Sequence, residues 1–313
     1  MVSNSSVAVQ RQSELERIVL SVLTGVPCVV LLSFNVIILF TLRSRQVFWE
    51  TSRYVLLTNL LVADSLYLLV SQVLYIFANS RVFLSYPVCG TLILYAMLTE
   101  SIFPLTLAEM SIERYVAVCF PLRHSSIVTM RSTAAAIALV WAFSFVNVLI
   151  RVVLMCQFPF EELDSLEMHR VCDTFVVLLT PVAAEYDRVY NIFVFSFSGL
   201  IIMFSFIAVV ITARSASSDR NSARKAQSTL LLHMIQLVLG LSPRISLPVS
   251  VALFQVMSWI NYVRLMNVTY VFLILLPRGL SPLIYGLRDQ AIRPMLLSNL
   301  CCGLKLTAKT QLS

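Results

Sequence analysis

Several charged side chains in this sequence lie inside long apolar runs, where a charge is costly. Glu113 and Arg114 are adjacent, so the carboxylate can hold the guanidinium in one conformation and release it in another. Asp64, Glu100 and Arg278 also lie within apolar stretches. A charge at the centre of a bilayer costs about 2.5–3.5 kcal/mol on insertion scales, so such residues are expected to pair internally or to serve a function. These residue types suit reversible ion pairing and the binding of polar groups.

The sequence lacks the groupings that catalysis and metal binding require. Its three histidines and seven cysteines do not fall at metal-ligand spacings, and no Ser/His/Asp or Cys/His arrangement is present. The last apolar run, residues 265–287, has no lysine that could form a Schiff base with retinal. We therefore expect no enzyme activity, no cofactor, no metal site and no nucleic-acid partner.

The apolar runs indicate what kind of protein holds these charges. Of the 313 residues, 58% are hydrophobic and only 12% are charged, and the mean hydropathy is +0.86, whereas a soluble domain has about 25% charged residues. A helix needs about 20 apolar residues to cross a bilayer, and the runs lack the alternation typical of barrel strands. We predict an all-α bundle of seven transmembrane helices, over residues 18–42, 54–77, 89–118, 133–153, 189–213, 226–256 and 265–287.

These spans divide the chain into three parts and orient it. We expect an extracellular tail over residues 1–17, a seven-transmembrane domain over 18–287, and a C-terminal part over 288–313 that begins with a short amphipathic helix, helix 8. The loops on one side carry fourteen Lys and Arg, and those on the other carry seven, including Arg151 and Arg188. The positive-inside rule places the first side in the cytoplasm. The chain is therefore expected in the plasma membrane with its N-terminus extracellular and its C-terminus cytoplasmic.

Three cysteines lie where an extracellular disulfide could form. Cys89 opens the third span on the outer side, and both Cys156 and Cys172 lie in the outer loop between the fourth and fifth spans. Disulfides persist in an oxidising exterior. We expect a Cys89–Cys172 bond that ties this loop over the mouth of the bundle, with Cys156 as the alternative partner.

Modification sites are expected at both ends of the chain. Asn4 begins an Asn-Ser-Ser glycosylation sequon, which agrees with an extracellular N-terminus. Cys301 and Cys302 follow the last span and are candidate palmitoylation sites, with two unmodified thiols as the alternative. A second sequon at Asn267 lies within or beside the seventh span, where it is expected to be too buried for glycosylation.

Three motifs in order resemble the odorant receptors of the rhodopsin-like (class A) G-protein-coupled receptor family, with the fish type as the nearest form. They lie at the end of the third span, the start of the sixth and the end of the seventh, and read MSIERYVAVCFPL over 110–122, KAQSTLLLH over 225–233 and SPLIYGLRD over 281–289. The resemblance covers the chain from Asn35 to the short helix after Tyr285. It implies a receptor that binds a small-molecule odorant and activates a heterotrimeric G protein, of the stimulatory, cAMP-raising kind.

The resemblance also implies roles for individual residues. Receptors of this type bind small molecules between the outer halves of the third, fifth, sixth and seventh helices, and change conformation at the inner ends. The candidate ligand-binding residues are Met97, Glu100, Ser101, Asn191, Phe195, Arg244, Leu247 and Tyr270. The candidate residues of the activation switch and G-protein coupling are Asp64, Glu113, Arg114, Tyr115, Lys225, Arg278, Pro282 and Tyr285. The alternative for the charged members is a structural pair, Glu100 with Arg244 or Asp64 with Arg278.

The sequence departs from the family pattern at three informative positions. Many rhodopsin-like receptors bind sodium around the position of Asp64, but here Ser281 stands where most have Asn, and Phe103 stands where a polar partner is common. These departures weaken the case for a sodium site. Ala96 stands where amine receptors carry an Asp, which disfavours an amine ligand held in that way.

Two other functions are compatible with seven spans. The first is a rhodopsin-like receptor for a non-odorant small ligand, such as a lipid. A multi-pass transporter is a remote alternative, because it would need a proton relay facing a pore and His233 lies too near the cytoplasmic end to provide one. The expected partners are the odorant, the G protein and the lipid membrane, and a homo- or heterodimer stays open.

Overall fold

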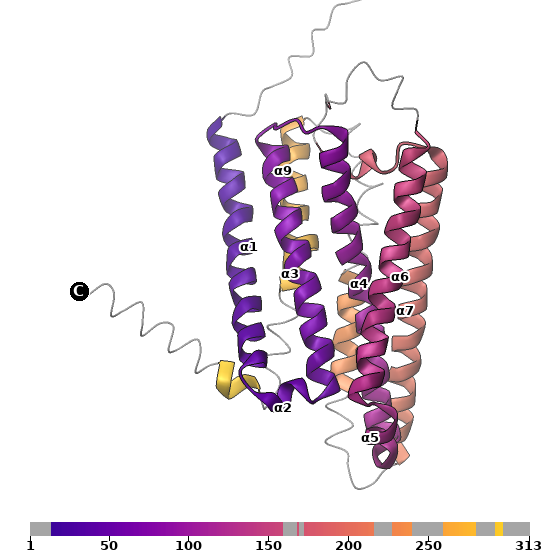
Figure 1. Ribbon diagram of the computed structural model, residues 1–313. Coiled ribbons are helices and arrows are strands. Elements are labelled where there is room, and N and C mark those ends of the chain that lie inside the picture. The colour runs from indigo at the N-terminus through magenta and orange to yellow at the C-terminus, as the bar shows by residue number, and fades with distance from the viewer. Residues whose placement is uncertain are drawn as a thin grey trace, which may run out of the picture.

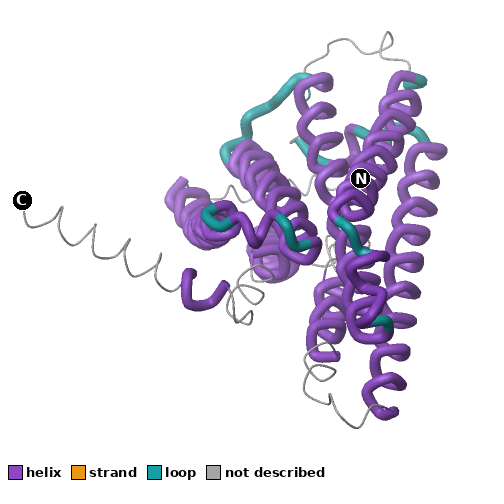
Figure 2. The backbone as a smooth tube through the Cα atoms, turned by 60° about the horizontal axis from the view of Figure 1, so that its bottom comes forward, coloured by secondary structure: helices purple, strands orange, loops and turns teal. Residues whose placement is uncertain are grey.

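The computed structural model describes residues 14–158, 168, 172–215, 227–239, 259–279 and 292–296, which contain helices and no strand (Figure 2). The all-α fold class is therefore confirmed for the described part of the chain. Within it, five helices are long and apolar enough to cross a membrane. They are α1 (Glu14–Arg43), α3 (Ser52–Asn79), α4 (Tyr86–Cys119), α6 (Met130–Cys156) and α7 (Pro181–Ser215).

The sixth and seventh predicted spans are described in part. Gln227–Leu239 forms an apolar helix inside the sixth span. The seventh begins as α9 (Trp259–Thr269) and continues as the π-helix η4 (Tyr270–Leu275), which is followed by α-helix to residue 279. π-Helical segments are rare and frequently occur at functional sites.

The helices begin earlier than the hydropathy pattern predicts. α1 begins at Glu14, four residues before the predicted span, and α7 begins at Pro181, eight residues before it. The first turns of α7 carry charged residues, so the hydropathy pattern assigns them to a loop. In the structure two of these residues, about one turn apart, form an ion pair, with Arg188 Nη2 2.7 Å from Glu185 Oε1. Charged side chains at a helix end can pair along the helix surface, so a helix can extend beyond its apolar part.

The long helices lie side by side and run between two ends of the bundle (Figure 1). At one end, which we call the α2 end, lie the short helices α2 (Gln46–Trp49) and α5 (His124–Ile127) and the helical turn 292–296. The other end, which we call the disulfide end, contains the start of α4 and the 3-10 helix η3 (Thr174–Val176). α4 contacts α3, α6 and α7. A larger share of its apolar stretch is buried inside the bundle than in the other four long helices that the structure describes, so α4 is at the centre of the bundle.

Apolar side chains are found both inside the bundle and on its surface. The main internal cluster joins Ile38, Leu60, Phe103 and Ile202, from four different long helices. Large apolar side chains also cover the outside, and the list includes Phe40, Leu139 and Leu200, which are 66%, 70% and 72% exposed. A soluble protein would bury such surfaces, whereas lipid solvates them. The packing therefore agrees with a membrane-embedded bundle.

The turn 292–296 lies inside the segment predicted to be an amphipathic helix. Ile292 and Leu296 are fully buried and belong to the main internal cluster, whereas Arg293 is exposed. This turn therefore has one apolar face against the bundle and one polar face.

Candidate functional site

A partly open cavity of about 230 Å³ lies in the bundle toward the disulfide end. Its walls come from α3, α4, α7, η4 and the segment around η3, and they combine apolar groups with a few polar ones. Such a lining is typical of small-molecule sites. Residues 240–258 lie outside the described part of the chain. The polar lining residues are Tyr67, Ser71, Glu100, Thr174 and Asp187, and Met97, Ala96 and Ile274 are among the apolar ones.

A second hollow, of about 440 Å³, lies between the outer ends of α1 and α3. It is lined by Arg17, Ser21 and Asn79 among others, and the Asn79 side chain donates hydrogen bonds to the Arg17 carbonyl (2.7 Å) and the Ser21 hydroxyl (2.6 Å). Although larger, this hollow contains none of the candidate ligand-binding residues. The cavity of about 230 Å³ is therefore the candidate site.

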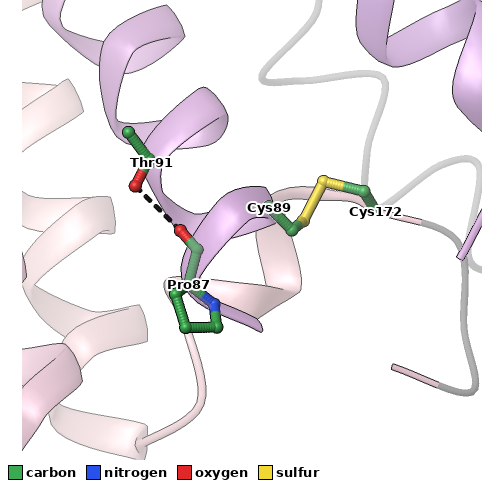
Figure 3. Close-up of a disulfide and its surroundings, with 4 residues drawn as sticks. All are labelled: Pro87, Cys89, Thr91 and Cys172. Carbon is green, nitrogen blue, oxygen red and sulfur yellow. Dashed lines mark hydrogen bonds between the residues drawn. A yellow bond between two sulfur atoms is a disulfide. The ribbon is translucent and has the colours of Figure 1, made fainter. Parts of the chain in front are cut away.

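The Cys89–Cys172 disulfide lies two residues before Thr174, which lines the cavity (Figure 3). Its Cα atoms lie 5.6 Å apart, and it joins the first turn of α4 to the segment that continues into η3. In that turn the Thr91 hydroxyl donates to the Pro87 carbonyl at 2.8 Å. The predicted disulfide is confirmed, and Cys156, its alternative partner, is an exposed free thiol.

The bond positions a small apolar cluster beneath it. Val176 and Val177 are buried against Cys89, Ile93 and Met97. This packing holds the η3 segment against α4, so that Thr174 and Leu178 can form part of the cavity wall.

A buried ion pair between α6 and α7 borders the cavity. The Arg151 Nη1 atom lies 2.7 Å from the Asp187 Oδ1 atom, and the Arg151 side chain is only 3% exposed. Asn147 Oδ1 accepts hydrogen bonds from Arg151 Nε (3.3 Å) and from the Tyr186 hydroxyl (3.1 Å). The guanidinium carbon also lies 5.5 Å from the ring centroids of both Tyr186 and Tyr190. Asp187 therefore lines the cavity with its negative charge already compensated by Arg151.

The sequence analysis missed this pair. Counting Arg151 among the outer loop charges was wrong, because Arg151 is buried inside α6, which reaches Cys156. The signal that could have found it is the spacing of Asn147 and Arg151, one helical turn apart on an otherwise apolar helix.

The structure places the candidate ligand-binding residues in different surroundings. Met97 and Glu100 line the cavity. The Ser101 hydroxyl donates to the Met97 carbonyl (2.8 Å) within α4, and the Asn191 side chain donates to the Asp187 carbonyl (2.7 Å) within α7. Phe195 packs into the main internal cluster instead. Arg244 and Leu247 lie outside the described residues.

Tyr270, another candidate ligand-binding residue, joins the seventh helix to α3. Its hydroxyl lies within hydrogen-bond distance of Ser71 Oγ (3.3 Å) and Gln72 Oε1 (3.2 Å), and its ring stacks on Tyr75 with centroids 4.8 Å apart. The Tyr75 hydroxyl donates to Asn267 Oδ1, and Asn267 is buried. The second glycosylation sequon is therefore inside the bundle, as expected.

Asp64 and Arg278 form an ion pair in the middle of the bundle. The Arg278 Nη1 atom lies 2.9 Å from the Asp64 Oδ1 atom, and the two side chains are 7% and 0% exposed. The guanidinium carbon lies 3.9 Å from the ring centroid of Tyr67 and 4.9 Å from that of Phe103. Tyr67 is also part of the cavity wall, so the pair lies next to the cavity. The structure thus contains the Asp64–Arg278 pairing that the sequence offered as an alternative.

A second group of polar contacts lies toward the α2 end. The Arg114 Nε atom lies 3.4 Å from the Glu113 Oε2 atom, and Glu113 Oε1 lies 3.7 Å from His124 Nε2 in α5. The Tyr115 ring contacts Phe204 of α7, with centroids 5.6 Å apart. The adjacent acid and arginine are therefore within ion-pair distance, as the switch hypothesis requires.

A hydrogen bond links α4 to the helix Gln227–Leu239. Its α4 residue, Ser111, lies about one turn before Arg114. Ser111 Oγ and His233 Nδ1 lie 2.9 Å apart, and both side chains are fully buried. Ser111 Oγ also lies 2.7 Å from the Leu107 carbonyl, to which its hydroxyl can donate. No sequence pattern predicts this contact, because the serine and the histidine are 122 positions apart. Other predicted functional residues lie outside the described part of the chain: Asn4, Lys225, Pro282, Tyr285, Cys301 and Cys302.

Comparisons with known proteins agree with this arrangement. Residues 33–285 match the family described as the 7 transmembrane receptor (rhodopsin family). The chain is 28% identical over 313 residues to odorant receptor 131-2 of Danio rerio, an alignment that covers 98% of this chain and 93% of the relative. It is 26% identical over 292 residues to olfactory receptor 4N5 of Homo sapiens, with 90% of each covered. It is 27% identical over 272 residues to olfactory receptor 4M1 of Mus musculus, with 84% of this chain and 83% of the relative covered.

Proposed function

The chain belongs to the odorant-receptor branch of the rhodopsin family of seven-transmembrane receptors, and we propose that it binds a small-molecule odorant in the cavity beside Glu100 and Asp187. Membership makes it a multi-pass protein of the plasma membrane and a receptor, not an enzyme. The observation that carries the proposal is a cavity with apolar and polar walls at one end of the bundle and a Glu113–Arg114 pair toward the other.

The orientation of the bundle forms part of the proposal. The disulfide end faces the exterior, where a disulfide is stable, and the α2 end faces the cytoplasm. The turns at the α2 end are rich in arginine, as the positive-inside rule requires, and include Arg43, Arg45, Arg123 and Arg131. The N-terminus is then extracellular and the C-terminus cytoplasmic.

The ligand site combines shape with a few polar anchors. Met97, Ala96 and Ile274 supply apolar surface, while Glu100 and Ser71 supply groups that can form hydrogen bonds. A ligand of suitable size would displace water from this lining and be oriented by the polar groups. Arg244 and Leu247 of the sixth span are proposed to complete the site.

Activation is a shift between two helix arrangements. Only a ligand that binds one arrangement better than the other can change their populations. In the described arrangement His233 holds the sixth helix against α4 through Ser111, and Glu113 lies beside Arg114. In the active arrangement the inner end of the sixth helix moves outward, His233 leaves Ser111 and Arg114 leaves Glu113. A heterotrimeric G protein, of the stimulatory, cAMP-raising class, then docks at the α2 end with Lys225, Pro282 and Tyr285 nearby.

The ligand site is tested by filling the cavity. Cells that express the full chain with a stimulatory G protein are exposed to a panel of water-soluble and volatile odorants, and cAMP is measured. Ala96→Phe places a ring inside a cavity of about 230 Å³ and should raise the half-maximal concentration of an active odorant about tenfold or more. Tyr95→Phe is the matched control, because Tyr95 is the preceding residue and is 38% exposed on the bundle surface.

The coupling end is tested in the same cells. Arg114→Ala should abolish the cAMP response while surface delivery stays measurable. A normal response in Arg114→Ala would contradict the switch, and an unchanged dose–response curve in Ala96→Phe would contradict the cavity as the ligand site.

A further inference from the structure

A carboxylate as deeply buried as that of Asp64 requires a compensating cation. Asp64 is completely buried, and the guanidinium of Arg278 lies 2.9 Å from its Oδ1 atom. An uncompensated charge in this position would be strongly destabilising. Many rhodopsin-family receptors bind a sodium ion at this position, so the residues around Asp64 decide whether sodium fits this chain.

The described surroundings of the pair suit a guanidinium better than a metal ion. Hard cations take oxygen ligands, yet one carboxylate oxygen of Asp64 already accepts a hydrogen bond from Arg278. The ring of Phe103 lies 4.9 Å from the guanidinium carbon, at the position where a polar partner is common in the family. The ring of Tyr67 lies still closer, at 3.9 Å. Aromatic faces attract a planar guanidinium, whereas they provide no oxygen lone pair to sodium.

We propose that Arg278 is a built-in cation, whose guanidinium takes the place of a sodium ion beside Asp64 and is held there by the rings of Tyr67 and Phe103. This assignment explains why Phe103 stands where a polar partner is common in the family. Its ring lies beside a guanidinium, and Arg278 supplies the charge that an ion supplies elsewhere.

The backbone of the seventh helix fixes this cation in place. Gly279 follows Arg278, and a Cβ atom added there would lie 2.5 Å from Leu31 of α1. The seventh helix and α1 therefore approach each other at Gly279 more closely than a side chain would permit. A sodium ion can leave by diffusion, whereas Arg278 is covalently attached to the seventh helix and therefore stays close to Asp64. The receptor should consequently be insensitive to sodium.

The inference is tested by the stability of the purified full chain, which depends neither on an odorant nor on a G protein. Thermal unfolding is measured with sodium chloride and with N-methylglucamine chloride at equal ionic strength. Wild type should give the same midpoint in both salts. Arg278→Met should unfold at a lower temperature, and sodium should not restore its midpoint, because the rings of Tyr67 and Phe103 still offer an ion no oxygen ligand. Arg264→Met is the matched control, since Arg264 lies on the same helix but its side chain is 62% exposed.

A double variant keeps the test informative if Arg278→Met does not fold. Asp64→Asn and Arg278→Met should each lower the yield of folded protein roughly fivefold or more, whereas the two together should restore it to within about twofold, because neither charge is left unpaired. The proposal is overturned if wild type shows sodium-specific stabilisation that Asp64→Asn removes. It is also overturned if Arg278→Met is as stable as Arg264→Met, or if the double variant recovers nothing.

Discussion

Two buried ion pairs among the described residues, Asp64–Arg278 and Asp187–Arg151, have nearly the same chemistry in different places. The charged atoms lie 2.9 Å apart in the first and 2.7 Å apart in the second, and in both the guanidinium lies beside two aromatic rings. The first joins α3 to the seventh helix at the centre of the bundle. The second joins the neighbouring helices α6 and α7 at the rim of the cavity.

The difference between the pairs lies in their access to other polar groups. The Asp64 side chain is 0% exposed, and its Oδ2 atom has no hydrogen-bond partner among the described residues. The Asp187 side chain is 13% exposed and lines the cavity, and Asn147 shares the guanidinium of Arg151. A charge with access to water or to a ligand can be solvated after its partner is lost, but a fully enclosed one cannot. The first pair should therefore contribute mainly to stability, and the second to both stability and ligand response.

The largest effect is expected when the central pair is broken. Asp64→Asn leaves the Arg278 guanidinium without its anion, and loss of one partner from a buried pair costs about 3–5 kcal/mol. The unfolding midpoint of the purified receptor and the fraction delivered to the cell surface should both fall sharply. An unfolding midpoint equal to that of wild type would show that the Asp64–Arg278 pair contributes nothing to stability. It would contradict the expectation that this pair is the more important of the two for stability.

An intermediate effect is expected at the rim. Arg151→Met leaves the Asp187 carboxylate without its guanidinium, but water in the cavity can solvate it, so the loss should be nearer about 2 kcal/mol. The added negative charge should also alter the odorant profile, with responses to positively charged ligands gaining relative to neutral ones. Unfolding midpoints and dose–response curves measure the two effects separately. A loss as large as that of Asp64→Asn, with an unchanged odorant profile, would remove the distinction between the pairs.

The central pair could be anticipated from the sequence and the rim pair could not. Asp64 and Arg278 each stand alone in a long apolar run, where a charge has few alternatives to an internal partner. Arg151 lies near the end of its run, where the hydropathy pattern does not separate a buried charge from a loop charge. The spans themselves were predictable because charged residues are scarce in them. The exact ends of the helices were not, because charged side chains that pair along a helix surface let the helix extend beyond its apolar part.

Contacts between distant helices were beyond the sequence for a different reason. Ser111 and His233 are ordinary residues on two helices, and only the packing of those helices brings them within 2.9 Å. The disulfide was easier to predict because few cysteines lie on the outer side, although the sequence alone left Cys156 as an alternative to Cys172.

The smallest effect is expected from the Glu185–Arg188 pair, which lies within one turn of Asp187 on α7 but is exposed on the surface of that helix. Asp187 and Arg188 are consecutive on α7, and successive residues of a helix point about 100° apart, since a turn takes 3.6 residues. Asp187 faces the bundle, whereas the Arg188 and Glu185 side chains are 70% and 57% exposed, with their charged atoms 2.7 Å apart. Glu185→Gln removes this ion pair without burying a charge, and exposed pairs contribute little because water screens them. The unfolding midpoint and the odorant dose–response curve should both match wild type within error. Glu185 and Asp187 lie within one turn of each other on α7 but differ in exposure. A measurable loss of stability in Glu185→Gln would therefore mean that burial does not determine how much an ion pair on α7 contributes to stability.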